Sequence, residues 1–230
     1  MDELIGRYGL EGPFLDAGCG QGDVALHLAK RGWQGLAADF SPEAVRAAAC
    51  NLAGYPVQTR SGDLMELSGK FHTIVNCTVI EHVKDDAALL RQFRSCLPDG
   101  GWLLLSMPTN PEKEWRWDDD YYGHYRRYTT AGLHKLLHEA GFEIVEVCDY
   151  TFPVFWAMRR VYTRILPVKK PLSDVPEENT AASSLQNAYE AGPLSKLVAA
   201  VPIWPLIYAL QRLFRHGSRG FEAILIARAV

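Results

Sequence analysis

The sequence predicts an α/β protein with a doubly wound, mostly parallel sheet of seven strands and a helical insertion before the last strand. Three observations indicate this fold. Apolar strand-like runs alternate with helical patterns through the first 149 residues, a glycine-rich turn follows the first run, and residues 220–230 form a late strand pattern. Alternating strands and helices are typical of a parallel sheet covered on both faces. A chain of 230 residues can bury such a core in a single domain.

Each expected element has a boundary signal. Ser41 followed by Pro42 is typical of a helix start, Thr129 or Thr130 can cap a later helix, and Gly141 ends it. The expected strands are 13–17, 35–39, 57–60, 71–79, 102–107 and 142–148, and the expected helices are 23–31, 42–53, 85–97 and 130–140.

Residues 150–219 interrupt this alternation, and we expect them to form a helical cap within the domain. Residues 152–168 are aromatic and carry three arginines, 169–191 are polar and are predicted to be a mobile loop, and 194–214 are apolar but interrupted by Pro202 and Pro205. No uninterrupted apolar stretch of about 20 residues occurs, so we expect no membrane span. Residues 220–230 are then the final strand.

Charge is distributed unevenly along the chain. The net charge is −3, but residues 1–149 carry 14 Lys and Arg against 22 Asp and Glu, whereas residues 150–219 carry 9 against 4. A dedicated nucleic-acid binder usually shows a basic excess, so no nucleic-acid partner is expected. The five cysteines are widely spaced without zinc-ligand patterns, and no apolar leader is visible. We therefore expect reduced thiols, no metal and a cytoplasmic protein.

The glycine-rich turn at residues 16–22 distinguishes between two kinds of nucleotide cofactor. A dinucleotide fingerprint has its third glycine five positions after the first, and counting from Gly18 that position is Asp23. Asp23 at the helix start and Asp16 before the turn would both repel a pyrophosphate. Both suit a cationic ligand without phosphates, of which S-adenosylmethionine is the example. Asp39 and Asp63, each at a strand end, are placed to accept hydrogen bonds from ribose hydroxyls and an adenine amino group.

The sequence resembles the class I S-adenosylmethionine-dependent methyltransferases, which have a Rossmann-like sheet. The matching pieces are FLDAGCGQGDVALHLA, LAADFSPEAV, SGDL, VIEHVKDD, LPDGGWLLLSMP, GHYRRYTTAGLHKLLHEAGF and FEAILIARA. They cover residues 14–142 and the last strand.

The resemblance implies a cofactor role for nine residues. It places Asp16, Gly18, Cys19 and Gly20 at the methionyl part, Asp39 at the ribose, Phe40 and Leu64 at the faces of the adenine, Asp63 at its amino group, and Asn76 near the sulfonium. The product would be S-adenosylhomocysteine. Two departures stand out. His72 occupies a usual Asp position, where we expect little effect, and the extension before the first strand is too short to cover the cofactor, so another segment covers it or the site is open.

Methyl transfer from a sulfonium needs mainly alignment and exclusion of water, so we expect few catalytic side chains. His124 is the best candidate for a general base, and His82 is a second one, although the alternative for His82 is a structural, hydrogen-bonded histidine. The GHxRRY loop places Tyr121, Tyr122, Arg126, Arg127 and Tyr128 as candidate substrate contacts. Alternatively these arginines pair with residues 118–120 and tether the loop. We expect one arginine to tether while the other faces the cavity.

The insertion has two interpretations. It is a helical cap over the sheet, or it also serves a lipophilic substrate and contacts an anionic membrane surface, since arginine on one helix face with Trp and Phe on the other suits an interfacial helix. The GHxRRY loop with such an insertion resembles small-molecule and quinone-pathway methyltransferases, so a protein at the inner membrane face is an alternative to a freely cytoplasmic one.

The predicted function is methyl transfer from S-adenosylmethionine to a small-molecule or lipid-linked acceptor, most favourably at oxygen, then carbon, then nitrogen. No DPPY or NPPY follows the fourth strand, which argues against methylation of nucleic-acid bases, and the cluster motif of radical enzymes is missing. An RNA or protein methyltransferase is the first alternative. A nicotinamide-dependent oxidoreductase and a non-catalytic S-adenosylmethionine-binding protein are alternatives from other classes.

Overall fold

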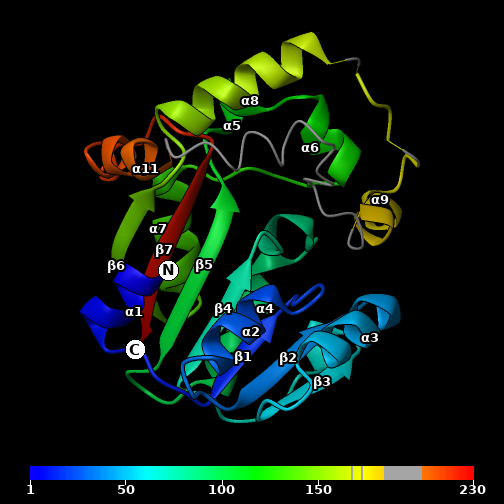
Figure 1. The fold of residues 1–230 in the computed structure, drawn as a ribbon, viewed down its shortest axis with the longest axis vertical. Coiled ribbons are helices and arrows are strands. Elements are labelled where there is room, and N and C mark those ends of the chain that lie inside the picture. The colour runs from blue at the N-terminus through cyan, green and yellow to red at the C-terminus, as the bar shows by residue number, and fades with distance from the viewer. Residues whose placement is uncertain (167, 172, 184–203) are drawn as a thin grey trace.

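A seven-stranded sheet forms the centre of the molecule, with helices on both faces (Figure 1). The computed structural model describes residues 1–166, 168–171, 173–183 and 204–230. The strand order is β3-β2-β1-β4-β5-β7-β6, in which β1 to β5 run parallel and β7 runs antiparallel to both of its neighbours. The strands are β1 Phe14–Ala17, β2 Gly35–Asp39, β3 Val57–Ser61, β4 Thr73–Cys77, β5 Trp102–Pro108, β6 Phe142–Asp149 and β7 Glu222–Ala229. The predicted fold class is confirmed.

Helices on the two faces enclose two apolar clusters. Helices α1 (Asp2–Tyr8), α2 (Asp23–Ala29) and α3 (Pro42–Asn51) cover one face, and α4 (Asp86–Cys96) and α7 (Thr130–Glu139) cover the other. Along β5, Leu103 and Leu105 point into one cluster and Leu104 into the other, as the alternation of a strand requires. The central strands are therefore buried on both sides, which explains their nearly continuous apolar sequence.

Two predicted helix starts are found with their capping hydrogen bonds. The Ser41 hydroxyl accepts the Ala44 N–H at 3.2 Å, and the Thr129 hydroxyl accepts the Gly132 N–H at 3.0 Å. Helix α1 was not predicted, and its Arg7 and Tyr8 side chains bond to Glu146 of β6. It lies against the sheet away from the carboxyl ends of β1 and β2, so it leaves the coverage of that edge to other segments (Figure 1).

A cap lies beyond the carboxyl ends of the parallel strands and the amino end of β7 (Figure 1). It contains α5 (Pro111–Glu114), α6 (Trp117–Tyr122), α8 (Val154–Ile165), α9 (Pro176–Ser183) and α11 (Trp204–Arg212). The prediction of a loop over 169–191 is wrong at α9, where Pro176 begins a helix; residues 184–191 lie outside the described residues. Of the apolar stretch 194–214, only 204–214 are described. No helix among the described residues is long and apolar enough to cross a membrane.

Candidate functional site

The glycine-rich turn after β1 has the backbone conformation that only glycine adopts readily. Gly18 and Gly20 have φ of 81° and 50°. A Cβ on Gly18 would lie 2.3 Å from Val79 Cγ2, so a larger residue would displace the segment that follows β4. The turn and that segment are therefore in close contact, although they lie about sixty residues apart in the sequence.

Two buried polar side chains lie beside this turn. Asp16, at the end of β1, accepts the Ala25 N–H of α2 at 2.9 Å, and burial together with the nearby Asp39 carboxylate raises the pKa of Asp16 to about 7. Asn76 donates from Nδ2 to the Ala17 carbonyl at 2.8 Å. Its Oδ1 is buried and has no hydrogen-bond partner among the described residues. A buried acceptor of this kind is normally satisfied, so a ligand donor is the natural partner.

Asp39 lies where the first two strands end. One carboxylate oxygen accepts the Gly20 N–H at 2.9 Å and the other accepts the Ser41 N–H at 2.9 Å. Both bonds come from backbone and fix the carboxylate, while each oxygen keeps lone pairs for further donors. The carboxylate is thus held in one orientation, as bidentate recognition of two adjacent hydroxyls requires.

The remaining predicted cofactor residues follow the ends of the first three strands. Asp63 caps a 3₁₀ helix, η1 (Leu64–Glu66), by accepting the Met65 N–H at 2.9 Å. Leu64 is buried, whereas Phe40 after β2 is 48% exposed. Cys19 is buried within the turn, where desolvation raises the pKa of its thiol. The structure brings these residues to the same edge as Asp39, on consecutive strand ends.

These residues fit S-adenosylmethionine. Asp16 and Asp39 suit ammonium and hydroxyl donors, Asn76 Oδ1 offers an unused buried acceptor, and the glycines leave room for close approach of a ligand. Asp16, together with Asp23 in the first turn of α2, would oppose a pyrophosphate. The chemistry of the donor set therefore favours the cationic cofactor over a dinucleotide.

A second cluster lies beyond β4, where the short 3₁₀ helix η2 (Ile80–His82) follows the strand. Ligand atoms of Glu81, His82 and His124 all lie within 4.8 Å of one another. The two imidazole rings meet edge to face with centroids 4.7 Å apart. Because three potential metal ligands are this close, the expectation of a metal-free site stays a prediction.

His82 is held in a neutral state. Its Nδ1 lies 2.9 Å from the Thr180 hydroxyl of α9 and 3.3 Å from the Gly123 carbonyl. Burial, and the proximity of His124, lower the pKa of His82 to about 3. Gly123 allows this contact, because a Cβ there would lie 2.2 Å from the Pro176 carbonyl. These contacts agree with the alternative interpretation of His82 as a structural, hydrogen-bonded histidine.

Glu81 is a buried carboxyl group beside these rings. It is 1% exposed, and burial raises its pKa to about 8. Its Oε2 has no hydrogen-bond partner among the described residues. At neutral pH this group is therefore largely protonated, which makes it a potential donor as well as an acceptor.

His124 follows α6 and contacts Asp119 twice. Its Nδ1 lies 2.8 Å from Asp119 Oδ1, and its backbone N–H donates to the Asp119 carbonyl at 2.9 Å. Hydrogen bonds from His124 and Arg127 and the Arg127 charge hold the pKa of Asp119 at about 2, although burial opposes them. The partner of His124 is therefore an ionised carboxylate.

Both arginines of the GHxRRY loop make tethering contacts, as the alternative interpretation of this loop expected. Arg126 pairs with Asp86 at 2.7 Å and donates to the Lys84 carbonyl at 2.7 Å. Arg127 is buried, pairs with Asp119 at 2.7 Å and donates to the Phe221 carbonyl at 2.8 Å. Both guanidinium groups thus hold the loop in place, although the buried Arg127 Nε has no hydrogen-bond partner among the described residues.

Tyr128 of the same loop is also a structural residue. It is buried in the core cluster, and its hydroxyl donates to Asp86 Oδ2 at 3.0 Å. Tyr121 and Tyr122 lie on α6 with ring centroids 5.1 Å apart. These two partly exposed rings remain as candidate substrate contacts, whereas Tyr128 has little surface to offer one.

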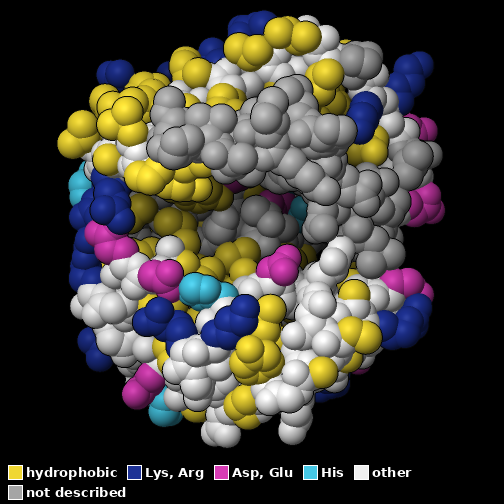
Figure 2. Space-filling model, in the orientation of Figure 1, with side chains coloured by type: hydrophobic (Ala, Val, Ile, Leu, Met, Phe, Trp, Pro, Cys, Tyr) yellow, Lys and Arg dark blue, Asp and Glu magenta, His cyan; other side chains and the backbone are white. Residues whose placement is uncertain are grey.

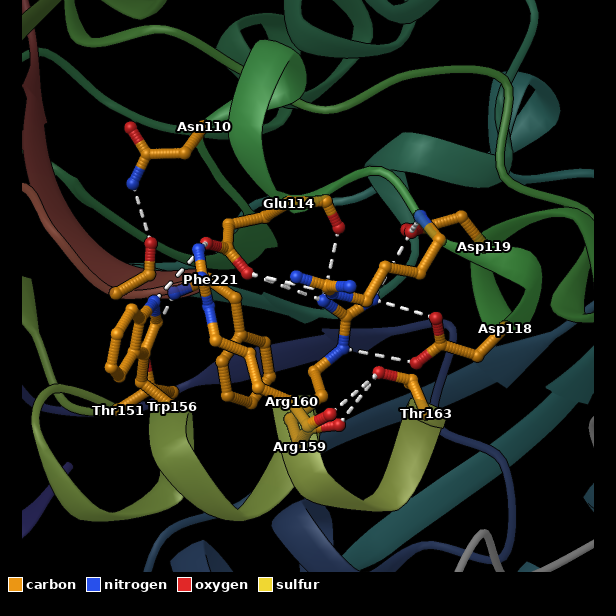
Figure 3. A network of polar contacts seen from close by, with 12 residues as sticks. Asn110, Glu114, Asp118, Asp119, Thr151, Trp156, Arg159, Arg160, Thr163 and Phe221 are labelled. Carbon is orange, nitrogen blue, oxygen red and sulfur yellow. Dashed lines mark hydrogen bonds and ion pairs between the residues drawn. The ribbon is translucent and has the colours of Figure 1, made fainter. Parts of the chain in front are cut away.

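A network of buried charges joins the cap helix α8 to α5 and α6, and the sequence reasoning missed it (Figure 3). Arg159 makes a two-pronged contact with Asp118, at 3.0 and 2.7 Å, and its Nη2 lies 3.1 Å from Asp119 Oδ2. Arg160 pairs with Glu114, which also accepts the Trp156 indole N–H at 3.1 Å. The only signal in the sequence was the complementary charge of residues 112–120 and 159–164.

The sequence analysis expected arginine on one face of this helix and Trp and Phe on the opposite face. The network shows instead that arginines and Trp156 share one face of α8. Arg159 and Arg160 point inward to the carboxylates, and Trp156 points inward with them (Figure 3). The outward face of α8 carries Val161, Tyr162 and Ile165 instead. Since a periodic pattern marks two faces without saying which one is buried, the sequence could not settle the direction.

A further group of polar side chains, also missed, lies near the carboxyl end of β5 and the start of β7. The Tyr150 hydroxyl donates to Glu222 Oε2 at 2.6 Å and lies 3.2 Å from the Ser106 hydroxyl. Burial raises the pKa of Glu222. Figure 2 shows a hollow between the cap and the sheet, with acidic and histidine side chains visible inside it.

Comparison with known families identifies the chain. The model of a family described as a methyltransferase domain matches residues 2–147. The chain belongs to this family. The predicted resemblance to class I S-adenosylmethionine-dependent methyltransferases is thereby confirmed at the level of family and fold.

Curated relatives of this methyltransferase-domain protein include ubiquinone biosynthesis O-methyltransferases. One from Xanthomonas campestris pv. campestris strain B100 is 34% identical over 113 residues, which are 46% of this chain and 47% of the relative. Another, from Xanthomonas euvesicatoria, is 36% identical over 98 residues, which are 40% of this chain and 41% of the relative. The chain thus spans about half the length of the curated relatives it matches.

Solved structures show the same fold. A [4+2]-cyclase covers 99% of this chain and 79% of its own, with a TM-score of 0.62 and 22% identity. An S-adenosylmethionine-dependent methyltransferase from Mesorhizobium loti covers 95% and 91%, with a TM-score of 0.58 and 16% identity. At these identities the likeness concerns fold alone.

Proposed function

We propose that this protein transfers a methyl group from S-adenosylmethionine to a hydroxyl oxygen of a small or lipid-linked acceptor. The observation that carries the proposal is the fixed Asp39 carboxylate at the β2 end, beside the positive-φ glycine turn. This pair suits a ribose next to a closely packed methionyl chain. Asp16, Gly18, Cys19 and Gly20 would contact the methionyl part, Asp39 the ribose, Phe40 and Leu64 the adenine faces, Asp63 the adenine amino group, and Asn76 the region of the sulfonium.

The chain's own contribution to the transfer is alignment, exclusion of water and removal of one proton. The bound cofactor supplies an activated methyl group with a neutral thioether as its leaving group. In this proposal the acceptor enters the hollow between the cap and the sheet (Figure 2). We assign Tyr121 and Tyr122 to the contacts that flank it, and His124 to its hydroxyl group. His124 accepts the hydroxyl proton, while neutral His82 packs against its ring and fixes it.

Oxygen is favoured over carbon and nitrogen as the acceptor atom, because the curated relatives are named as O-methyltransferases of ubiquinone biosynthesis. The same name supports an acceptor with a lipid tail. An RNA or protein acceptor is less favoured, since residues 1–149 carry a strong acidic excess.

A binding protein without catalytic activity is the alternative from a different class of function, and one similar structure supports it. A [4+2]-cyclase shares this fold over nearly the whole chain, so the fold by itself does not ensure methyl transfer. A nicotinamide-dependent oxidoreductase is disfavoured by Asp16 and Asp23, which would oppose a pyrophosphate.

Calorimetric titration with S-adenosylhomocysteine, run beside NADH, tests the cofactor assignment. Micromolar binding of the first and none of the second is expected, and the reverse result would sustain the oxidoreductase. Turnover then separates enzyme from binding protein: normal affinity with no methyl transfer to any lipid or soluble extract would favour the latter. A salt-dependent shift with RNA would support the nucleic-acid alternative.

We also propose that residues 150–219 contact an anionic lipid surface, at the inner membrane face of the cell. Apolar side chains gather over α8 and α11 (Figure 2), where Ile165 is 74% and Leu213 is 78% exposed. Exposed Arg164, Lys169 and Lys170 adjoin the end of α8 and complement anionic headgroups. An apolar face with neighbouring cations is typical of interfacial binding.

Co-sedimentation with phosphatidylglycerol vesicles tests this contact. The native protein should bind them, and Ile165→Glu should lower the bound fraction several-fold. Val145→Glu, at an exposed apolar residue on the edge strand β6 outside residues 150–219, should not. Equal sedimentation of all three proteins, or binding to phosphatidylcholine alone, would contradict an anionic docking surface.

A further inference from the structure

Asp119 is a buried and heavily constrained carboxylate that the function proposed above does not use. It lies on α6 with no exposed surface. Oδ1 contacts His124 Nδ1 at 2.8 Å and Arg127 at 2.7 Å, while Oδ2 contacts Arg159 at 3.1 Å and accepts the Arg116 backbone N–H at 2.8 Å. Four donors converge on one carboxylate, an arrangement that fixes both its position and its ionised state.

This arrangement determines the tautomer of His124. An ionised carboxylate can only accept, so the hydrogen bond at 2.8 Å places the proton of the neutral ring on Nδ1. The lone pair is then on Nε2, the nitrogen that Asp119 does not occupy. The backbone bond from His124 to the Asp119 carbonyl at 2.9 Å holds the ring beside its partner.

We infer that Asp119 is the positioning residue for His124, and that Arg159 makes its placement depend on the cap helix α8. The inference rests on the proposed function. The acceptor oxygen forms a C–O bond with the methyl carbon as the C–S bond breaks with its electron pair to sulfur, and the hydroxyl proton moves to His124 Nε2. Asp119 stabilises the imidazolium formed in that step.

Arg159 connects this pair to the cap. It contacts Asp118 through two nitrogens and donates to the Glu114 carbonyl at 3.0 Å, so its guanidinium plane is fixed (Figure 3). From this position it also reaches Asp119. A lysine keeps the charge but lacks the planar fork, so Arg159→Lys should loosen Asp119 without removing the charge.

The ring nitrogens of His124 can be observed directly by ¹⁵N NMR of histidine-labelled native protein. The proton is expected on Nδ1, and a proton on Nε2 in the neutral ring would overturn the inference without any variant. This measurement needs no catalysis, so it stands apart from the test of His124 as the base.

Kinetics supply the second test. Asp119→Asn should lower kcat by about 10²–10³-fold, because the amide favours the wrong tautomer, while the affinity for S-adenosylhomocysteine stays within about threefold. Asp119→Glu should recover part of the rate. Asp120→Asn, the neighbouring exposed carboxylate, is the control and should stay within about threefold of the native rate.

Two outcomes distinguish a failure of the positioning role of Asp119 from a failure of the proposed base, His124. Equal rates for Asp119→Asn and Asp120→Asn would remove the positioning role. Full activity in His124→Ala, with the Nδ1 proton still seen in the native protein, would instead remove the proposed base. A shift of the acidic limb of the pH–rate profile to lower pH in Asp119→Asn supports positioning, since a purely structural role would leave that limb in place.

Discussion

The two halves of the sheet's carboxyl edge are built in different ways. Over β1 and β2, polar groups are fixed by nearby backbone: Asp39 accepts the N–H groups of Gly20 and Ser41. Beyond β4 and β5, they are fixed by side chains from distant segments, as Arg159 contacts Asp119 across forty positions. The proposed cofactor half is thus fixed without contacts from α8, whereas Asp119 in the proposed acceptor half is held partly by Arg159 of α8. We therefore expect changes in α8 to affect the acceptor half more than cofactor binding.

The largest expected effect comes from removing the cap's anchor. Arg159→Ala leaves Asp118 buried and short of its partner, which should lower the free energy of unfolding by about 3–5 kcal/mol. Urea denaturation measures it, and Arg164→Ala, an exposed arginine on the same helix, should change stability by at most about 0.5 kcal/mol. If the cofactor half does not depend on α8, the folded Arg159→Ala protein still binds S-adenosylhomocysteine with native affinity. A large loss of affinity would show that the cofactor half and the acceptor half are coupled.

The next largest effect is expected on cofactor affinity, from a substitution in the cofactor half. Asp39→Ala should cost about 2–3 kcal/mol of binding free energy, because two charge-assisted hydrogen bonds to the ribose are lost, and the Kd for S-adenosylhomocysteine should rise about 30- to 150-fold. Calorimetry measures it. Glu43→Ala, which removes an exposed carboxylate on α3, is the control. An unchanged Kd in Asp39→Ala would mean that the site assignment is wrong.

A smaller effect follows from the raised pKa of Asp16, which is about 7 because the group is buried near Asp39. As the pH rises through 7 the carboxyl loses its proton and attracts the cationic cofactor, so S-adenosylmethionine should bind about tenfold more tightly at pH 8 than at pH 6. Asp16→Asn should flatten this dependence. Affinity that falls as the pH rises would contradict the assigned contact.

The smallest expected effect is that of metal removal. Because proton transfer to His124 needs no cation, dialysis against EDTA should change the methyl-transfer rate by less than about twofold. A large loss, restored by adding a divalent cation, would show that Glu81, His82 and His124 hold a metal ion, for which their spacing within 4.8 Å is suitable. The acceptor half would then need a different chemical description.

The cofactor half could be predicted because its determinants are local. A strand, a turn that needs glycine, and an acid at the next strand end are all visible within short windows around Asp16 and Asp39. The parallel sheet then brings the strand ends to one edge without further information.

The acceptor half could be predicted only in part. His124 and the tethering alternative for the loop arginines were both visible, but the partner of Asp118 lies 41 positions away, and local pattern does not encode such pairs. The orientation of α8 was predicted wrongly for the same reason. Its inward face is charged because Arg159 and Arg160 pair with the acidic side chains of α5 and α6. Only the assembled tertiary structure supplies those partners.

The central claim is that the chain moves a methyl group from S-adenosylmethionine to oxygen. The most direct test incubates the purified protein with S-adenosylmethionine labelled in its methyl group and a bacterial lipid extract, then follows label into the organic phase. The account predicts label in a methoxy group, with a rate at least about 10²-fold lower for His124→Ala. No label in lipid or aqueous extracts, despite micromolar binding of S-adenosylhomocysteine, would contradict it.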